Sequence, residues 1–340
     1  MGSVQLSKLR IVPGVRVERT ATTARGRKTN ASVENGTSFD ATKSAEENAA
    51  RALKSVLPVE TNASSYVKVH PGLHLIYEPY TKLLVRASYN NSITRPPVLN
   101  LVPSSNTVND DTDTITISNP KLKPYTSDNF ELAVQKYFEP VGSFEVGVYL
   151  KEIKNYFRTV TTFVPEGTDN GFEGRYAGYR LNQAQNVGAA RYRGFEFNYQ
   201  QQFSFLPGFW RGFGLSANYT YTQAQGLFGG TAYLKQIANV RPRFGNVVLS
   251  YAGHGLDVRL LGNYQGAYYR GGAGATTLWG NSQLMLDLKA QYRINRRYQV
   301  YFEVSNLLDE NVSTYVQEGG LPLYAQKQGM LFATGVKVAF

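Results

Sequence analysis

The segment 284–294 reads LMLDLKAQYRI, and apolar and polar residues alternate along it one by one. Leu284 and Leu286 fall on one side of the alternation, and Asp287 and Lys289 fall on the other. Successive side chains of a β-strand point to opposite faces of the sheet, so a period of two residues predicts a strand with one apolar and one polar face. The surroundings of the two faces are therefore expected to differ.

The same alternation recurs along most of the chain. We count about twelve segments of this kind, near 9–19, 66–77, 83–94, 130–138, 144–157, 193–205, 212–225, 244–252, 256–265, 284–294, 298–307 and 329–340. The one helix-like piece is Ser44–Leu57, in which Ser44 has the residue type of an N-cap and Glu46 and Glu47 follow in the first turn. The sequence therefore predicts an all-β protein.

The connections between these segments alternate between short and long. The short ones contain the Gly, Pro and Asn residues that tight hairpins need, and they are Glu78–Lys82, Glu139–Ser143, Leu206–Arg211, Gly253–Gly255 and Asn295–Arg297. The long polar ones lie at about 20–65, 95–129, 158–192, 226–243, 266–283 and 308–328. Short turns at one rim and long loops at the other are typical of an antiparallel up-and-down transmembrane β-barrel in the outer membrane.

The two faces of the predicted strands support this interpretation. The apolar face of the clearest segments carries no charged residue, and a Lys or Arg there would cost about 2–4 kcal/mol at the bilayer midplane. The opposite face has the charges expected of a water-filled lumen, at Glu145, Glu196, Asp257, Arg259, Asp287, Lys289, Arg293 and Glu303. Tyr and Phe residues gather near strand ends, where aromatic girdles meet lipid headgroups. Because every backbone polar group in hydrocarbon must be paired, the barrel is expected to close.

Composition excludes several classes of function. The 340 residues include no Cys and three His, and 36 Lys and Arg against 25 Asp and Glu give a net charge of +11. Without Cys there is no disulfide scaffold, thiolate metal site or thiol nucleophile. P-loop, HExxH and GxSxG motifs are absent, and the acidic run 109–114 lacks EF-hand spacing. The basic residues form no single stripe, so nucleic-acid binding is not expected. We expect no enzyme, metal or cofactor.

The long loops hold the candidate ligand-binding residues. Aromatic rings there can stack on a siderophore or sugar, and arginines can attract an anionic ligand. The candidates are Arg175, Tyr176, Tyr179, Arg180, Tyr233 and Trp279. The basic residues of 158–193, which include Arg191 and Arg193, are also expected to face outward, where lipopolysaccharide phosphates lie. Lipid and lipopolysaccharide of the outer membrane are therefore expected partners.

The last strand carries a separate signal. It reads GMLFATGVKVAF, with Phe332, Val336, Val338 and the final residue Phe340 on one face. A terminal aromatic residue with apolar residues at every second position resembles the signal by which bacterial outer-membrane barrels are recognised for insertion. The barrel-assembly machinery is therefore another expected partner.

Five stretches in order along the chain resemble the TonB-dependent receptors, which are outer-membrane active transporters. They are Leu9–Thr20; His70–Pro97, with Arg95-Pro96 at its exit; Asn119–Phe138, which begins NPKLKP; Asn186–Gln200, with Gly194 and Glu196; and Val304–Asn311, with the NLLD motif at Asn306–Asp309. Each stretch is a weak signal alone, and their order makes the resemblance specific.

The resemblance implies TonB-energised uptake of a scarce small-molecule or glycan ligand, in the siderophore, cobalamin or glycan class, across the outer membrane of a Gram-negative-type bacterium. Family members have a barrel of twenty-two strands and an N-terminal plug that contacts the TonB complex. This sequence shows no plug, no TonB-contacting box and no export signal. We therefore expect residues 1–340 to be the C-terminal half of such a barrel, carrying its wall and ligand-facing loops.

Two alternatives stay open at this point. A passive porin would close the roughly twelve strands into a complete barrel by themselves. A soluble β-sandwich adhesin or enzyme domain would instead bury its apolar face against a second layer of structure.

Overall fold

The computed structural model describes residues 2–29, 41–103, 106–172, 174–228, 237–272 and 276–339. One sheet dominates it, and its strands follow the order β1-β2-β3-β4-β7-β8-β9-β10-β11-β12-β15-β16-β19 with antiparallel neighbours. Their bounds are β1 (Val4–Leu6), β2 (Leu9–Thr29), β3 (Val56–Tyr80), β4 (Leu83–Thr94), β7 (Tyr125–Phe138), β8 (Gly142–Phe163), β9 (Arg180–Gln202), β10 (Phe213–Phe228), β11 (Arg243–Gly253), β12 (Leu256–Gln265), β15 (Gln283–Arg293), β16 (Tyr298–Ser305) and β19 (Leu331–Val338). Each segment predicted from the alternation falls on one of these strands, so the predicted fold class is confirmed.

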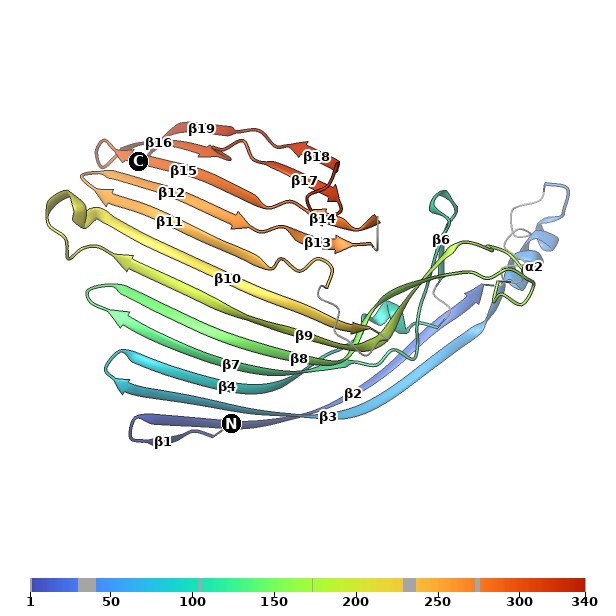
Figure 1. The fold of residues 1–340 in the computed structure, drawn as a ribbon. Helices are drawn as coiled ribbons and strands as arrows, with labels where there is room; N and C mark the ends of the chain where they lie inside the picture. The colour runs from blue at the N-terminus through green and yellow to red at the C-terminus, as the bar shows by residue number, and fades with distance from the viewer. Residues whose placement is uncertain are drawn as a thin grey trace.

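The sheet curls into a trough whose two rims differ (Figure 1). Tight hairpins join the strands at one rim, and the long connections all leave from the other. The up-and-down order and the sorted loops agree with the sequence-based prediction.

The strands run further into the predicted long loops than the alternation indicated. β8 has 22 residues and β9 has 23, so the predicted loop 158–192 is strand at 158–163 and 180–192 and is a loop only between them. A tilted strand needs only about 9–11 residues to cross a bilayer, so the outer parts of these strands extend beyond it. Polar side chains occur on both faces there, and the period of two residues is lost.

The remaining long connections are also structured. The connection from β4 to β7 contains the 3-10 turns η1 (Val98–Leu101) and η2 (Asp110–Thr112) and the hairpin of β5 (Asn106–Asn109) and β6 (Thr114–Ile117). The predicted loops 266–283 and 308–328 together form a second sheet of β13 (Tyr268–Gly271), β14 (Leu278–Gly280), β17 (Asn311–Val316) and β18 (Pro322–Lys327). At the opposite rim, the 3-10 turn η3 (Gly208–Gly212) joins β9 to β10.

The predicted helix is present as α2 (Ala45–Ser55) at the tip of the β2–β3 hairpin (Figure 1). Ser44 and Glu47 exchange hydrogen bonds, with the Glu47 N–H donating to Ser44 Oγ at 3.1 Å and the Ser44 N–H donating to Glu47 Oε2 at 3.0 Å. This is a capping box, which satisfies two free N–H groups of the first turn. Among the described residues, no helix is both long and apolar enough to cross a bilayer.

The large apolar side chains of one sheet face stay uncovered. Val15, Val148 and Phe332 are 70%, 53% and 59% exposed, and within the described ranges no second layer packs over them. A soluble domain would bury such a face, because each large apolar side chain gains about 1.5–3 kcal/mol on burial. This arrangement contradicts the β-sandwich alternative.

The sheet is open at both edges. Within the described part of the chain, β19 pairs only with β16, and β2 pairs only with β3 and the three residues of β1. The predicted closure is therefore not made by these strands among themselves. An unpaired edge in hydrocarbon leaves backbone N–H and C=O groups without partners.

Candidate functional site

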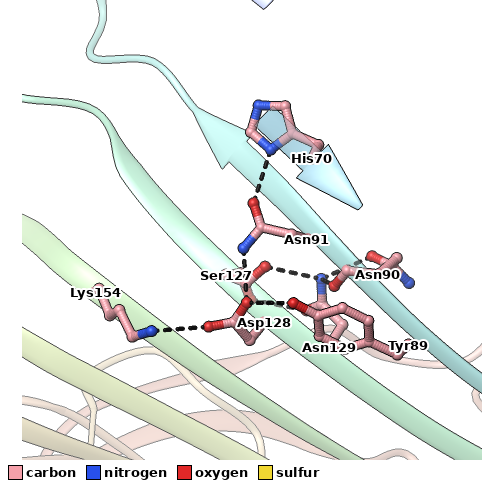
Figure 2. Close-up of polar contacts among 8 residues, drawn as sticks. All are labelled: His70, Tyr89, Asn90, Asn91, Ser127, Asp128, Asn129 and Lys154. Atoms are coloured by element: carbon pink, nitrogen blue, oxygen red, sulfur yellow. Dashed lines mark hydrogen bonds and ion pairs between the residues drawn. The ribbon is translucent and has the colours of Figure 1, made fainter. Parts of the chain in front are cut away.

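The loop-bearing rim is organised by a fork between β3 and β4. The two strands pair as far as Gly72 and Asn90, after which β3 continues with β2 alone while β4 stays with β7. The His70 side chain lies at the fork, is 4% exposed, and shares a 2.7 Å hydrogen bond from Nδ1 with Asn91 Oδ1. Figure 2 shows the polar network that continues from there to β8.

Asp128 is the centre of this network. Its Oδ1 accepts hydrogen bonds from Asn91 Nδ2 at 2.7 Å and from the Tyr89 hydroxyl at 3.1 Å. Its Oδ2 accepts from Lys154 Nζ at 3.0 Å. A carboxylate with three donors holds four strands in one register, since His70, Asn91, Asp128 and Lys154 come from β3, β4, β7 and β8.

The β4–β7 connection fills the space that the fork leaves. Arg95 donates to Glu18 at 2.6 Å and to Thr20 at 3.1 Å on β2. Leu101 and Leu122 pack with Ala24 of β2 in a small buried cluster. Gly26 permits this approach, because a Cβ there would lie 1.9 Å from the carbonyl oxygen of Pro103. The arginine of the Arg-Pro motif therefore anchors a loop.

The NPKLKP motif fastens the other end of the same connection. Asn119 Nδ2 donates to the Ala184 carbonyl at 2.8 Å, and the Lys123 N–H donates to Asn186 Oδ1 at 2.9 Å. Asn186 donates back to the Lys123 carbonyl at 3.0 Å. These contacts give the motif a structural role on β9, which the sequence did not reveal.

Four of the predicted ligand-binding residues lie together where this connection meets the β8–β9 loop. The Tyr179 hydroxyl donates to Asp110 Oδ1 at 3.2 Å, and Arg180 Nη2 donates to the Thr112 carbonyl at 3.2 Å. The ring of Tyr176 lies 5.2 Å from that of Tyr179 and 5.1 Å from the Arg175 guanidinium carbon. Burial, and then the hydrogen bond to Asp110, raise the pKa of Tyr179 above its usual value. Two loops distant in sequence therefore form one aromatic and cationic surface.

Trp279 belongs to a different group. It lines a hollow of about 250 Å³ with Tyr221, Thr222, Gln223, Ala224, Ile237, Val240, Pro242, Tyr268 and Tyr269. Its ring lies 6.0 Å from that of Tyr269, and the Arg241 guanidinium lies 4.2 Å from the centre of the Tyr268 ring. Arg241 Nη1 is buried, and no residue in the described part of the chain forms a hydrogen bond with it. Tyr233 lies outside the described residues.

The sequence analysis did not single out Tyr268 and Tyr269. The dipeptide Tyr268-Tyr269 followed by Arg270, inside a polar loop, is a signal of the same kind that singled out Trp279. Arg241 belongs to a basic loop that the sequence predicts to face outward, but its contact with Tyr268 could not be predicted, because that contact depends on how two separate loops pack.

The predicted insertion signal lies on β19. Phe332, Val336 and Val338 pair with Val304, Val300 and Tyr298 of β16 and share their apolar face. Phe340 lies outside the described residues. The described residues of the predicted insertion signal therefore lie on the apolar sheet face that no second layer covers.

The NLLD motif forms the bend between the main sheet and the second sheet. Asn306 is 4% exposed and has a φ of +56°. Its side chain accepts from the Glu310 N–H at 2.8 Å and donates to the carbonyls of Glu310 at 3.2 Å and Gly329 at 3.0 Å. Asp309 pairs with Lys327 at 2.6 Å. The motif therefore positions the sheet that carries Trp279.

Comparison with protein families gives a match over residues 1–307 to the model described as "TonB dependent receptor-like, beta-barrel". A search of curated proteins found no match. Similar solved structures include the copper transporter OprC, with a TM-score of 0.64 and 14% identity over 98% of this chain and 46% of that one. Another is the ferric-catecholate import receptor Fiu from E. coli K12. Its TM-score is 0.65, with 16% identity over 98% of this chain and 43% of that one.

A third similar structure is a double mutant of the Serratia marcescens hemophore receptor HasR in complex with its hemophore HasA and heme. Its TM-score is 0.61, with 15% identity over 98% of this chain and 49% of that one. At such identities the likeness shows the fold. The chain spans about half the length of these structures.

Proposed function

Because this chain belongs to the family of TonB-dependent receptor-like β-barrels, we propose that it forms the C-terminal part of the barrel wall of an outer-membrane receptor that takes up a scarce ligand with energy from the TonB complex. The observation that carries the proposal is the two-faced open sheet. Its outer face is apolar and uncovered, its inner face bears charge pairs such as Lys289 with Glu303 and Arg259 with Asp257, and its long loops share one rim.

The open edges favour a partial barrel over a self-contained porin. A twelve-stranded porin would pair β19 with β1 or β2, and the described strands form no such ladder. Further strands, from the rest of a longer protein, would satisfy both edges. The solved structures in the same fold are about twice as long as this chain, which fits that arrangement.

The ligand site proposed for this part of the wall is the Trp279 hollow, together with the Arg175–Arg180 surface. Four aromatic rings line this hollow, and the buried guanidinium of Arg241 lies against one of them, which suits a ring-bearing anionic ligand. The siderophore class matches this chemistry, and the cobalamin and glycan classes are the remaining candidates. One similar structure is a mutant of the ferric enterobactin receptor PfeA in complex with enterobactin, and another is the HasR mutant in complex with its hemophore HasA and heme.

The partners follow from this role. Lipid and lipopolysaccharide would surround the apolar face, and the barrel-assembly machinery would recognise Phe332, Val336, Val338 and Phe340 on the last strand. Coupling to the TonB complex would pass through a plug inside the lumen rather than through the wall described here.

Uptake by living cells tests the proposal. The complete gene that encodes this chain is deleted and restored in its own bacterium, and accumulation of radioactive iron is measured with a panel of siderophores at limiting iron. We expect one or more of them to require the gene and to lose uptake in a strain without TonB. Uptake that persists without TonB would support the passive porin, and a chain absent from the outer-membrane fraction would refute both.

A further inference from the structure

The inner face of the wall is basic along β2, β3 and β4. The register places Arg10 and Arg86 in one row with Glu196 of β9, which lies on the lumen side of the sheet. Side chains at every second position of a strand share one face. Within 10–18, 68–76 and 84–90, the charged and titratable residues of the inner face are Arg10, Arg16, Glu18, Lys68, His70, His74 and Arg86. This part of the wall therefore has four cations and one carboxylate, besides its two histidines.

The neighbouring strands have the opposite charge. In the rows that continue from 84–90 of β4 across β7, β8 and β9, the inner face carries Glu131, Glu145 and Glu196 against a single cation, Lys151. Regions of opposite charge create a field between them, and the low dielectric constant of the wall strengthens it. An anionic ligand inside the lumen is therefore drawn toward β2–β4 and away from β7–β9.

A hollow of about 200 Å³ opens on this basic face at the fork between β3 and β4. Its floor is backbone, because Gly14 and Gly72 lie opposite each other and place no side chain on the inner face. The side chains around this floor, all on the inner face, are those of Val12, Arg16, His70, His74 and Asn90. This fork hollow is therefore open to the lumen and bordered by a guanidinium, two imidazoles and an amide.

His70 has one ring nitrogen left for a ligand. Asn91 donates its amide N–H to Asp128, so the Asn91 oxygen accepts the hydrogen bond from His70 Nδ1. Nε2 lies on the side of the ring away from Asn91 (Figure 2); it is buried, and no described residue forms a hydrogen bond with it. A buried polar atom without a partner costs free energy, which a bonded ligand atom would recover. Because Nδ1 already carries a proton, Nε2 donates only when the ring is an imidazolium.

Arg16 supplies positive charge on the same side of the hollow. It lies directly opposite His70 on β2. Its Nε is 3.0 Å from Glu18 Oε1, and Arg95 pairs with the same carboxylate at 2.6 Å. Two guanidinium groups thus share one carboxylate, which leaves one positive charge uncompensated. The Arg16 side chain is 61% exposed, so its other N–H groups are accessible from the lumen.

We propose that the fork hollow binds an oxyanion group, a carboxylate or a phosphate, of the transported ligand during its passage along the lumen. Arg16 and the protonated Nε2 of His70 donate to the oxygens, and the amide of Asn90 is a further donor. Charged donors form the strongest hydrogen bonds to oxyanions, and the planar guanidinium matches two oxygens at once. The hollow has room for one such group rather than a whole ligand. The inference rests on the proposed function, and it adds a site inside the lumen to the Trp279 hollow at the rim.

Binding in the fork hollow is coupled to protonation of His70. The charged and titratable groups around the ring are Arg16 and Glu18 of β2, Lys68 and His74 of β3, Asp128 of β7, which is reached through Asn91, and Lys154 of β8. An anion between Arg16 and the ring favours the imidazolium, so its binding takes up a proton. Affinity should therefore be higher at acidic pH and decrease as the pH rises through the range in which histidines lose their charge.

Calorimetry on the full-length receptor tests the proposal. The protein is purified in mild detergent and titrated with succinate and with inorganic phosphate in about 0.15 M salt, which screens diffuse attraction to surface charge. We expect at least one anion to bind, more tightly at about pH 6 than at about pH 8. Arg16→Gln should weaken binding about tenfold or more, because a charged donor is lost, and Arg16→Lys should recover part of it. Whichever anion binds identifies the group as a carboxylate or a phosphate.

A second variant fills the hollow and leaves the hydrogen bonds of His70 in place. A Cβ at Gly72 would lie 3.7 Å from the Tyr89 carbonyl oxygen and 3.9 Å from that of Gly14, which are ordinary contacts, and valine is favoured in strands. Gly72→Val should therefore assemble normally, as judged by its compact electrophoretic mobility, and lose anion binding. The matched control Arg259→Gln removes a lumen-side cation on β12 and should bind like the wild type.

The pH dependence separates the two histidines. His70→Gln should bind equally at both pH values, whereas His74→Gln should keep the difference. Binding of neither anion, unchanged binding in Gly72→Val, equal loss in Arg259→Gln, or a pH dependence that survives in His70→Gln would overturn the proposal. TonB-dependent uptake by Gly72→Val at the wild-type rate would reject this inference alone. Uptake by the wild type that does not need TonB would instead reject the proposed function.

Discussion

His70 and Asn91 are joined by a 2.7 Å hydrogen bond across the point where β3 separates from β4. The backbone ladder between β3 and β4 ends at Gly72 and Asn90, and beyond that point the His70 side chain keeps the two strands in contact. Through Asn91 it also connects β3 to the carboxylate of Asp128. The long β2–β3 hairpin can therefore extend beyond the wall without loosening the strands below it.

Substitution of His70 should weaken the fork. His70→Ala removes a buried ring and leaves the Asn91 oxygen without its partner, so we expect a loss of about 2–3 kcal/mol in unfolding free energy. The measurement is the temperature at which the detergent-solubilised barrel loses its compact electrophoretic mobility. His74→Ala is the control, because His74 lies on the same strand face but is exposed. Equal effects of the two substitutions would contradict the role assigned to His70.

Asn306 should stabilise the bend that carries the second sheet. Asn306→Ala removes three hydrogen bonds and places alanine at positive φ, with an expected cost of about 2–4 kcal/mol. Asn306→Gly keeps the backbone conformation and should cost less. The readout is the rate of limited proteolysis within 317–330. Exposed Asn311 provides the control Asn311→Ala, and unchanged cleavage in Asn306→Ala would argue against the bend being held by this side chain.

A charged residue introduced on the outer face tests whether that face contacts lipid or water. Val148 is 53% exposed on that face, so in water Val148→Arg would be nearly neutral. In a bilayer it should cost about 2–4 kcal/mol near the midplane. Urea-driven unfolding in lipid vesicles measures the difference.

The control for this substitution is Asn198→Arg, an exposed lumen-side position on β9 opposite Glu145. It should unfold like the wild type. If Val148→Arg were as stable as Asn198→Arg, the uncovered face would not be in contact with hydrocarbon.

Ligand binding should depend on Trp279. Loss of one stacking ring removes roughly 1 kcal/mol, so Trp279→Ala should weaken binding of the ligand identified in the uptake assay about fivefold to tenfold. The chain has two tryptophans, and Trp210 lies at the opposite rim. Fluorescence quenching by the ligand should therefore persist in Trp210→Phe and decrease in Trp279→Phe. The reverse result would exclude the Trp279 hollow as the binding site.

The sequence alone determined the alternating segments of the main-sheet strands, their two faces and the sorting of short and long connections, but not the extension of β8 and β9 or the second sheet. The alternation of Leu284, Asp287 and Lys289 can be interpreted from the segment itself, because the pleat of a strand places successive side chains on opposite faces whatever strands lie beside it. Turn residues such as those at 253–255 are local in the same way. The resemblance of the NLLD and NPKLKP motifs to the family was also visible, although their structural roles were not.

Only the tertiary structure decided the fork at His70, the docking of the two loops through Tyr179 and Asp110, and the outer position of Arg191 and Arg193 on β9. Each depends on register or on contacts between segments distant in the chain. A shift of one residue would turn Arg193 from the lipid side to the lumen. No single segment contains that information, because register is fixed by the neighbouring strands and not by the strand itself.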